Sequence, residues 1–521
     1  MDLPPTDFHL RPLDIVALAT YLIALFGVGI YFSRKQRSEE MYFLAGRKMP
    51  WFLAGISVLA TLLSTLSYLS LPGEMIRNGV GFFYGFIGLA LVIPIVNYIV
   101  IPALMRLPVT TVYDFFERRF GLSTRVMTAV VFIVMRLTWI GIITYTASFA
   151  VSEMTGWDVT WIAVGVGIVT LFYTTTGGMT AVVWCDFAQF VLLFGGAIFI
   201  PIYIGFQTQA SPVEWWETFE QAGRSETIFF SFDPQVRLTV VGMILVILLW
   251  NLSTHSADQV AAQRYLSTPS PDAARRSMWV YSIANVGLSC LLALCGLALF
   301  YFYFRQSASP IETFATEIRK DADSYLPKFI ATQLPAGLSG LMLAAILAAA
   351  MSSLSSGIHS ISTVAVNDFF NRFRSHESSG PRPLLAQLMA LVSGAAAIFL
   401  AIAFDVVRKN MSEWNLLDLI ERVNHLFVAP LGALFLIGVL LRRVSEIPSL
   451  IGFAAGVLTS FLVSFSETIF DYEISFTWIM PAAFVVTIVV AFVAGHAFPP
   501  PTPSKIAAVS SDATPEESDY V

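Results

Sequence analysis

The chain is poor in charged residues and in cysteine. Charged residues make up only 13% of its 521 positions, whereas 56% of the residues are hydrophobic and the mean hydropathy is positive. A soluble chain of this length cannot hide so many apolar side chains in its cores. The three cysteines all fall in apolar stretches, which argues against a disulfide framework. The chain also lacks a basic cluster, so a nucleic-acid partner is not expected.

Long apolar runs are the dominant feature of what is present. Thirteen of them are long enough to cross about 30 Å of hydrocarbon, and they predict an all-α polytopic membrane protein in a lipid bilayer. No soluble catalytic domain fits between them, so we do not expect an enzyme. The predicted spans are 14–33, 51–76, 81–105, 124–153, 158–176, 180–206, 238–257, 276–304, 336–366, 384–404, 416–441, 446–466 and 474–496.

The distribution of Lys and Arg predicts the orientation. Most of them fall in alternate connecting segments, starting with the one after the first span, and positive short loops stay in the cytoplasm. The N-terminus is therefore expected outside and the C-terminus inside a plasma or inner membrane. The segment before the first span lacks a basic n-region, so we expect this span to be retained. The tail 498–521, rich in Pro, Ser and acidic residues, is expected to be disordered.

One apolar span carries a stripe of hydroxyl groups. The stretch AAAMSSLSSGIHSISTVAVNDF covers residues 348–369. At about 100° per residue, one half of this helix would carry Ser352, Ser355, Ser356, His359, Ser360 and Thr363, and the other half Leu347, Leu354, Ile358 and Ile361. Polar groups inside a membrane are costly, which makes the stripe a candidate functional site.

Two other spans are interrupted by polar residues in corresponding places. The second span contains Ser64, Thr65, Ser67, Ser70, Pro72 and Gly73, and the seventh contains Asn251, Ser253, Thr254, His255, Ser256 and Asp258. Broken helices in matching halves are typical of transporters built from inverted repeats, because their free carbonyl and N–H groups bind ions and substrate. Alternatively, these hydroxyls only allow close helix packing or bond to carbonyls of their own helix.

Three passages carry a family resemblance. TTTGGMTAVVWCDFAQFVLLFGG (174–196), ADQVAAQRYLSTPSPDAARRS (257–277) and LAAAMSSLSSGIHSISTVAVNDFF (347–370) resemble signatures of the sodium:solute symporter family, and the likeness extends from about Phe43 to Arg443. It implies a leucine-transporter-like fold with a five-plus-five inverted repeat, one extra helix before the repeats and two after. The implied parts are residues 1–50 with the first span, a first repeat 51–206, an outer loop 207–237, a second repeat 238–443, two further spans in 444–497, and the tail 498–521.

The resemblance also implies sodium sites. Sodium is a hard cation that prefers oxygen ligands. A first site would combine carbonyl groups of the broken second span with the serine stripe, at Ala60, Leu63, Ala349, Ser352 and Ser353. A second site would use Asp186 with Ser355 and Ser356. Alternatively, the serines only pack helices together, and Asp186 satisfies backbone groups or pairs with an arginine.

The identity of the solute is less determined. Leu62, Phe86 and Thr254 stand where the family's sugar carriers have polar side chains, and only Asn251 is kept, which disfavours a simple hexose. Arg136, in the fourth span, would suit a carboxylate, because a guanidinium binds one through two parallel hydrogen bonds. It could instead be a structural partner of Asp186 or of backbone carbonyls. The residues expected to form the substrate site are Ser64, Ser67, Phe82, Phe86, Arg136, Asn251, Thr254 and His255.

We therefore expect a monomeric symporter that imports a small organic anion, such as a monocarboxylate or sialic acid, with two Na⁺ ions by alternating access. A sodium symporter for a neutral sugar or polyol is the main alternative. A transporter-like membrane sensor is a further one, although the chain shows no signalling module. His255, His359 and His425 are interpreted as buried histidines and not as metal ligands, because their spacing matches no metal site.

Overall fold

The computed structural model describes residues 10–34, 36, 38–107, 109–371, 383–410 and 416–507, and for 410, 416–425 and 507 it describes the backbone alone. All regular secondary structure in these ranges is helical, which confirms the predicted class. The long helices are α1 (Pro12–Ser33), α3 (Trp51–Leu62), α4 (Thr65–Asn78), α5 (Phe86–Ile95), α8 (Leu122–Thr155), α9 (Val159–Thr208), α11 (Val240–Ala257), α13 (Pro271–Gln306), α16 (Leu338–Val364), α18 (Leu384–Asn410), α19 (Leu416–Leu440), α20 (Glu446–Ser464) and α22 (Ile479–Ala497). The short helices are α2 (Glu39–Leu44), α6 (Ile101–Met105), α7 (Val112–Arg119), α10 (Pro212–Gln221), α12 (Gln259–Leu266), α14 (Ile311–Glu317), α15 (Tyr325–Gln333), α21 (Ser466–Phe470) and α23 (Pro503–Ala507).

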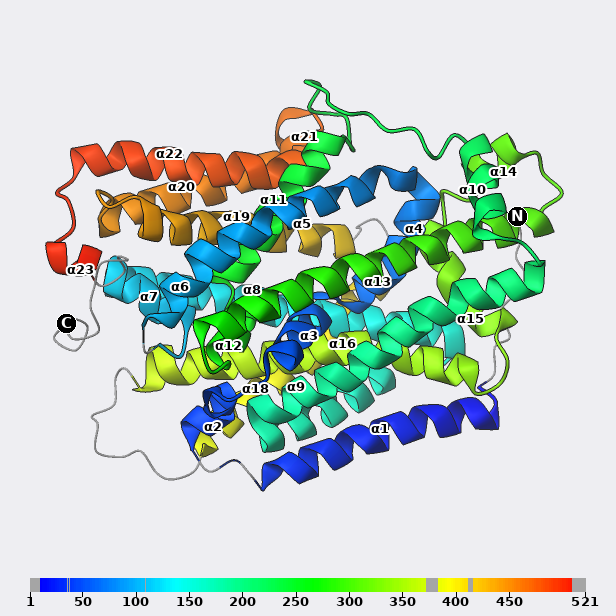
Figure 1. Ribbon diagram of the computed structural model, residues 1–521, viewed down its shortest axis with the longest axis horizontal. Coiled ribbons are helices and arrows are strands. Elements are labelled where there is room, and N and C mark those ends of the chain that lie inside the picture. Colours follow the sequence, from blue (N-terminus) through cyan, green and yellow to red (C-terminus); the bar gives the residue numbers. More distant parts are fainter. Residues whose placement is uncertain are drawn as a thin grey trace.

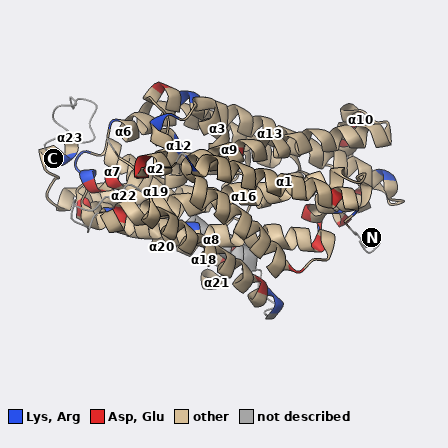
Figure 2. Ribbon diagram, turned by 90° about the horizontal axis from the view of Figure 1, so that it is seen from below, with Lys and Arg blue, Asp and Glu red and all other residues tan. Residues whose placement is uncertain are grey.

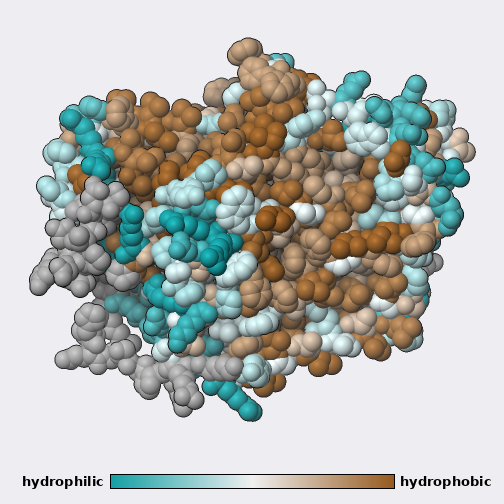
Figure 3. Space-filling model, in the orientation of Figure 1, coloured by the Kyte–Doolittle hydropathy of each residue, from teal (hydrophilic) through white to brown (hydrophobic). Residues whose placement is uncertain are grey.

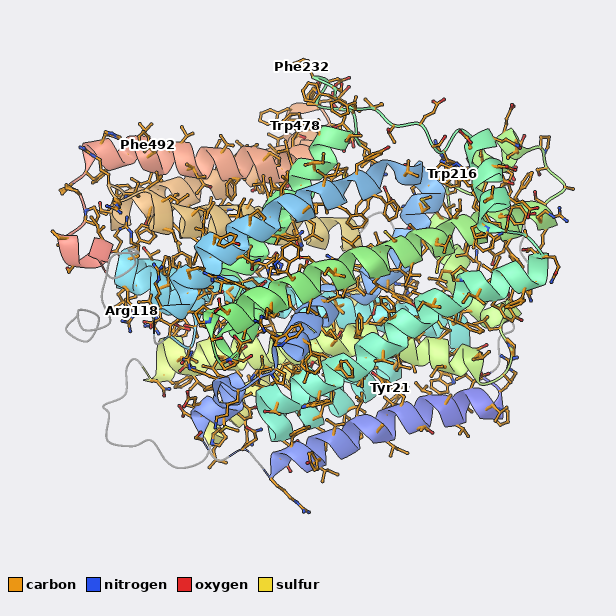
Figure 4. All side chains as sticks on the ribbon, viewed as in Figure 1. Tyr21, Arg118, Trp216, Phe232, Trp478 and Phe492 are labelled. Atoms are coloured by element: carbon orange, nitrogen blue, oxygen red, sulfur yellow. The ribbon has the colours of Figure 1, made fainter. Side chains whose placement is uncertain are left out.

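Most long helices run along the long axis of the molecule (Figure 1). Charged residues gather mainly towards the two ends of this axis (Figure 2), and the face between the ends is largely apolar (Figure 3). The short helices α7 and α23 lie at one end and α10 and α14 at the other; Figure 4 labels Arg118 on α7 and Trp216 on α10. An apolar belt between two polar ends is the form that a lipid bilayer requires of a polytopic protein.

Ten helical segments of the described chain are long and apolar enough to cross a membrane. The number is smaller than thirteen for three reasons. Residues 65–105 form one nearly continuous helical run, α9 covers two of the predicted spans, and the described apolar part of α19 begins only at Leu426. The thirteen spans and the inverted repeat stay predictions.

Helix α9 changes direction at Gly178. A straight helix of its 50 residues would be about 75 Å long, more than twice the thickness of the hydrocarbon. Gly178 has φ 56° and ψ −158°, a backbone conformation open almost only to glycine. A Cβ at this position would also lie 2.9 Å from the carbonyl oxygen of Tyr42. The break divides α9 into two segments that match the predicted spans 158–176 and 180–206.

Helix α16 is the most enclosed of the candidate spans. In its most apolar window 94% of the residues are buried, and it packs against α1, α3, α8, α9 and α18. The small residues of α16 permit this, because a Cβ at Gly340 would lie 2.3 Å from the carbonyl oxygen of Asp14 in α1. Tyr21 of α1, labelled in Figure 4, reaches the same core and accepts a hydrogen bond from Gln189 at 3.3 Å. The serine stripe therefore faces other helices and not lipid.

Candidate functional site

The predicted second span is broken after α3. Leu63 leaves the helical conformation with ψ 105°, and the Ser64 side chain caps the start of α4 by accepting a hydrogen bond from the Ser67 N–H at 3.4 Å. The last carbonyl groups of a helix have no partner within it and carry the negative end of its dipole. The break therefore places carbonyl oxygens of α3 that have no partner in their own helix inside the protein.

These carbonyl groups meet the serine stripe of α16. The Ser352 hydroxyl donates to the Ala60 carbonyl at 2.7 Å and also lies 3.0 Å from the Ala349 carbonyl. The Ser353 hydroxyl donates to the Thr61 carbonyl at 2.8 Å. Three of the five residues predicted for the first sodium site, Ala60, Ala349 and Ser352, are thus in contact. Ser353 bonds to Thr61 instead, and Leu63 directly follows these carbonyl groups in the chain. The Thr61 carbonyl is an additional oxygen that the sequence did not reveal.

A second polar cluster lies along the same α3–α16 interface, where α9 also packs. Asp186 of α9 is fully buried and accepts a hydrogen bond from the Ser57 hydroxyl at 2.5 Å. Ser356 lies 2.7 Å from the Thr61 hydroxyl. Ser355, also assigned to the second sodium site, donates to the Ser352 carbonyl of its own helix at 3.1 Å.

Arg264 of α12 enters this cluster. Its guanidinium lies 3.6 Å from the Asp186 carboxylate and donates hydrogen bonds to the hydroxyls of Ser57 and Ser356. Arg264 follows the seventh predicted span, in a connecting segment where the Lys and Arg pattern predicts the cytoplasmic side, but its side chain is fully buried. Asp186 therefore has an arginine partner, the alternative left open by the sequence.

The predicted seventh span is broken at Asp258. This residue ends α11 with an extended backbone, and its carboxylate caps α12 by accepting a hydrogen bond from the Val260 N–H at 2.9 Å. The same carboxylate forms a buried ion pair with Arg136 of α8. The structural partner of Arg136 is thus Asp258 and not Asp186.

A cavity of about 360 Å³ lies between the two broken spans. Four of the predicted substrate residues line it, namely Ser67, Phe82, Phe86 and Asn251. Leu63 also belongs to its lining, so the cavity adjoins the residues predicted for the first sodium site. We call it the outer cavity.

The outer cavity has one polar wall, formed largely by α13. Tyr281, Asn285 and Ser289 repeat every four residues along this helix. The Tyr281 hydroxyl donates to the Asn251 side chain at 2.6 Å and accepts a hydrogen bond from Asn285 at 3.2 Å. The sequence analysis missed this row, although its four-residue spacing within an apolar span is a readable signal.

A smaller cavity of about 40 Å³ lies beside the first, and we call it the inner cavity. Arg136 and Thr254, both predicted substrate residues, line it together with Asp258. Leu62, Trp139 and Trp250 belong to the linings of both cavities. The two tryptophans were not predicted, and they stand between the larger space and the buried ion pair.

Two predicted substrate residues line neither cavity. Ser64 serves as the cap of α4, and His255 is fully buried with its Nδ1 atom 2.6 Å from the Tyr265 hydroxyl. His359 packs against the rings of Tyr42 and Phe43, whereas the His425 side chain is outside the described residues. Among the described residues no group of three or more His, Cys, Asp or Glu side chains could hold a metal ion. The oxygen clusters at α3 and α16 suit an alkali cation instead.

The chain is similar to known proteins both in sequence and in fold. The model of the sodium:solute symporter family matches residues 42–456. Sodium/sialic acid symporter NanT of Aliivibrio fischeri is 28% identical over 86% of this chain and 86% of its own length. Sodium/sialic acid symporter SiaT of Proteus mirabilis is 29% identical over 86% of this chain and 88% of its own length. The solved outward-open structure of a Na⁺-coupled sialic acid symporter superposes with a TM-score of 0.82 at 26% identity, covering 94% of this chain and 99% of that one.

Proposed function

Because the chain belongs to the sodium:solute symporter family, we propose that it imports a small organic anion by coupling it to two sodium ions. The observation that carries this proposal is the contact between the carbonyl groups at the end of α3 and the hydroxyls of Ser352 and Ser353. It joins one half of a broken helix to a central helix through oxygen atoms alone. Such an arrangement suits sodium, which binds hard oxygen ligands.

The first site holds its cation without a formal negative charge. Carbonyl groups of Ala60, Leu63 and Ala349 and hydroxyls of Ser352 and Ser353 would replace the water around the ion. The partial negative charge at the end of α3 favours the cation. Neutral ligands bind sodium more weakly than carboxylates do, which allows release on the far side of the membrane.

The second site would add a carboxylate. Asp186, Ser355 and Ser356 supply one charged and two hydroxyl ligands, and Asp186 and Ser356 already belong to one polar cluster. For a monoanion, one sodium ion makes the transfer electroneutral, and a tenfold sodium gradient then supports only about tenfold accumulation. With two sodium ions, two chemical gradients and one net positive charge drive the transfer. Their combined free energy is about 5 kcal/mol at 100 mV and a tenfold sodium gradient.

The outer cavity would receive the body of the solute and the inner cavity its carboxylate. Both named relatives carry sialic acid, which is a carboxylic acid. Arg136 supplies a cation at the inner cavity, and its planar fork can bind a carboxylate through two hydrogen bonds. Its charge is shared with Asp258, so the carboxylate must compete with this partner.

A neutral sugar or polyol is the second candidate, because of the wall of the outer cavity. None of the described residues that line the outer cavity carries a charge. Asn251, Tyr281 and Asn285 suit hydroxyl groups, and Phe82 and Phe86 offer aromatic faces to the apolar side of a ring.

A ligand screen followed by uptake assays tests these proposals. The purified protein is screened by thermal shift in sodium against small carboxylates and neutral sugars, and each hit is assayed in sealed proteoliposomes. We expect carboxylates to stabilise the protein and a sodium gradient to drive their uptake. Arg136→Lys should weaken their binding about tenfold, because an ammonium cannot make the planar two-bond contact. Stabilisation by sugars alone would replace the anion by the second candidate, and uptake independent of sodium would contradict the symport mechanism.

A further inference from the structure

The buried guanidinium of Arg264 lies where the second sodium ion is expected. It contacts groups from three helices: Ser57 and Thr61 of α3, Asp186 of α9, and Ser356 of α16. Its Nε atom is 3.2 Å from the Ser57 hydroxyl, and Nη2 is 3.2 Å from the Thr61 hydroxyl. Two of its partners, Asp186 and Ser356, are proposed sodium ligands.

Asp186 is the one negatively charged group among the residues named in this cluster. Arg264 and Asp186 are both 0% exposed, so solvent does not screen their interaction. A sodium ion bound to Asp186 and Ser356 would stand beside the guanidinium, and two cations so close together in a buried site repel strongly. One of them has to leave the carboxylate.

We infer that Arg264 is a tethered cation that occupies the second sodium site and that sodium must displace. This inference rests on the proposed function, because it takes Asp186 and Ser356 as sodium ligands. In the absence of sodium the guanidinium neutralises a carboxylate that would otherwise be buried and unpaired, which is costly. The apparent affinity of the site for sodium then depends on the difference between the free energies with which sodium and the guanidinium bind the carboxylate.

The position of Arg264 gives this competition a mechanical consequence. Arg264 lies on α12, the second half of a broken span, whereas Asp186 and Ser356 lie on α9 and α16. The guanidinium therefore links α12 to α9, α16 and α3, and it also donates to the Val260 carbonyl of α12 itself. When sodium binds Asp186 and Ser356, the contacts of Arg264 with these two residues are lost.

The decisive experiment measures thermal unfolding of the full-length protein across a sodium series, with choline chloride keeping the ionic strength constant. Arg264→Gln removes the competing charge and keeps hydrogen-bonding capacity. We expect its half-saturating sodium concentration to fall about tenfold relative to wild type, and its stability without sodium to drop sharply. Asp186→Asn combined with Arg264→Gln removes both charges, so the gain in sodium affinity should disappear.

Two further variants separate competition from a structural role. Arg119→Gln removes another buried arginine, which donates to the carbonyls of Gly438 and Leu441, and should lower stability equally at every sodium concentration. Arg264→Lys keeps a cation that makes fewer contacts, so its half-saturating concentration should fall about threefold. If Arg264→Gln does not fold, Arg264→Lys decides the question.

The outcomes distinguish this inference from the function on which it rests. An unchanged or raised half-saturating concentration in Arg264→Gln or Arg264→Lys would overturn the inference if Asp186→Asn alone still removes one bound sodium. If Asp186→Asn leaves the sodium response of the otherwise wild-type protein unchanged, the second sodium site itself is wrong. The inference then fails with it, whereas the first site is unaffected.

Discussion

At the scale of single residues, the hydroxyls of Ser352 and Ser353 are central to the proposed first sodium site. Each donates to a carbonyl at the end of α3, so the polar groups at this interface satisfy one another. A hydroxyl can rotate and offer its oxygen to a cation instead, because it is both donor and acceptor. The same few atoms can thus satisfy the empty site and the loaded one.

Ser353→Ala tests the first sodium site. Losing one hydroxyl removes a ligand and leaves the Thr61 carbonyl without its donor, which should cost about 1–3 kcal/mol of stability. We expect sodium-driven uptake to fall more than tenfold while the protein stays folded. Ser362→Ala is the matched control, because Ser362 lies on the same helix as Ser353 but its hydroxyl donates to the Ala386 carbonyl of α18, outside the site. Normal sodium dependence in Ser353→Ala would contradict the assignment.

The ion pair of Arg136 and Asp258 permits a double-variant test. Arg136→Gln should destabilise the protein by about 3–5 kcal/mol, because it leaves a buried carboxylate unpaired. Combining it with Asp258→Asn should restore most of the stability, since an asparagine oxygen still caps α12.

If the ion pair also serves the substrate, uptake should stay lost in this double variant. Unfolding in urea and uptake in proteoliposomes report the two effects separately. Recovery of both stability and uptake would make the pair purely structural.

At the scale of helices, the breaks in α9 and in the two broken spans determine where the polar groups of the site lie. Gly178→Ala should destabilise the protein by several kcal/mol, because its positive φ and the nearby Tyr42 carbonyl both exclude a Cβ. Gly195→Ala lies on the same helix with nothing within 4 Å of its Cβ position, so it should be neutral or slightly stabilising. Thermal unfolding of the two purified variants compares them directly. Equal melting temperatures would show that the break at Gly178 is not required.

The sequence predicts the helices well and their partners less well. Hydrophobic length identifies the long helices but not their number of spans, and hydroxyl clusters locate both breaks and the stripe of α16, because these features are local. The partners of Arg136 and Arg264 depend on which helices pack together, which periodicity does not encode. Trp139, Trp250 and the row on α13 were missed because aromatic and single polar residues in a span resemble ordinary packing positions.

At the scale of the whole molecule, ion coupling is the property to measure. Wild type should show a sigmoidal sodium dependence with a Hill coefficient of about two. Asp186→Asn removes the charge that favours the second cation, so the dependence should become hyperbolic and the charge moved per substrate should fall by about one. Electrical recording with simultaneous tracer uptake measures both quantities. A hyperbolic response in wild type, with charge movement matching one sodium, would return Asp186 to a structural role.

The orientation of the molecule is a separate prediction. With Cys185, Cys290 and Cys295 replaced, Glu226→Cys and Ser504→Cys place single thiols at exposed positions in the outer loop and near the C-terminus. A membrane-impermeant maleimide applied to intact cells should label the first thiol, and only permeabilised cells should label the second. The opposite labelling would reverse the predicted topology.

The hydrogen bonds between α3 and α16 also bear on leakage. A carrier that imports solute has to return empty, and this step is fast only if the vacant site can be sealed without stranding polar groups. Ser352 and Ser353 provide such a seal by bonding the carbonyls of Ala60 and Thr61. A carrier that has bound an ion but no solute has lost these hydrogen bonds and has not yet formed contacts with the solute. Two serines would thus favour the fully empty and fully loaded carrier over the half-loaded one, so that little of the sodium gradient is dissipated without transport.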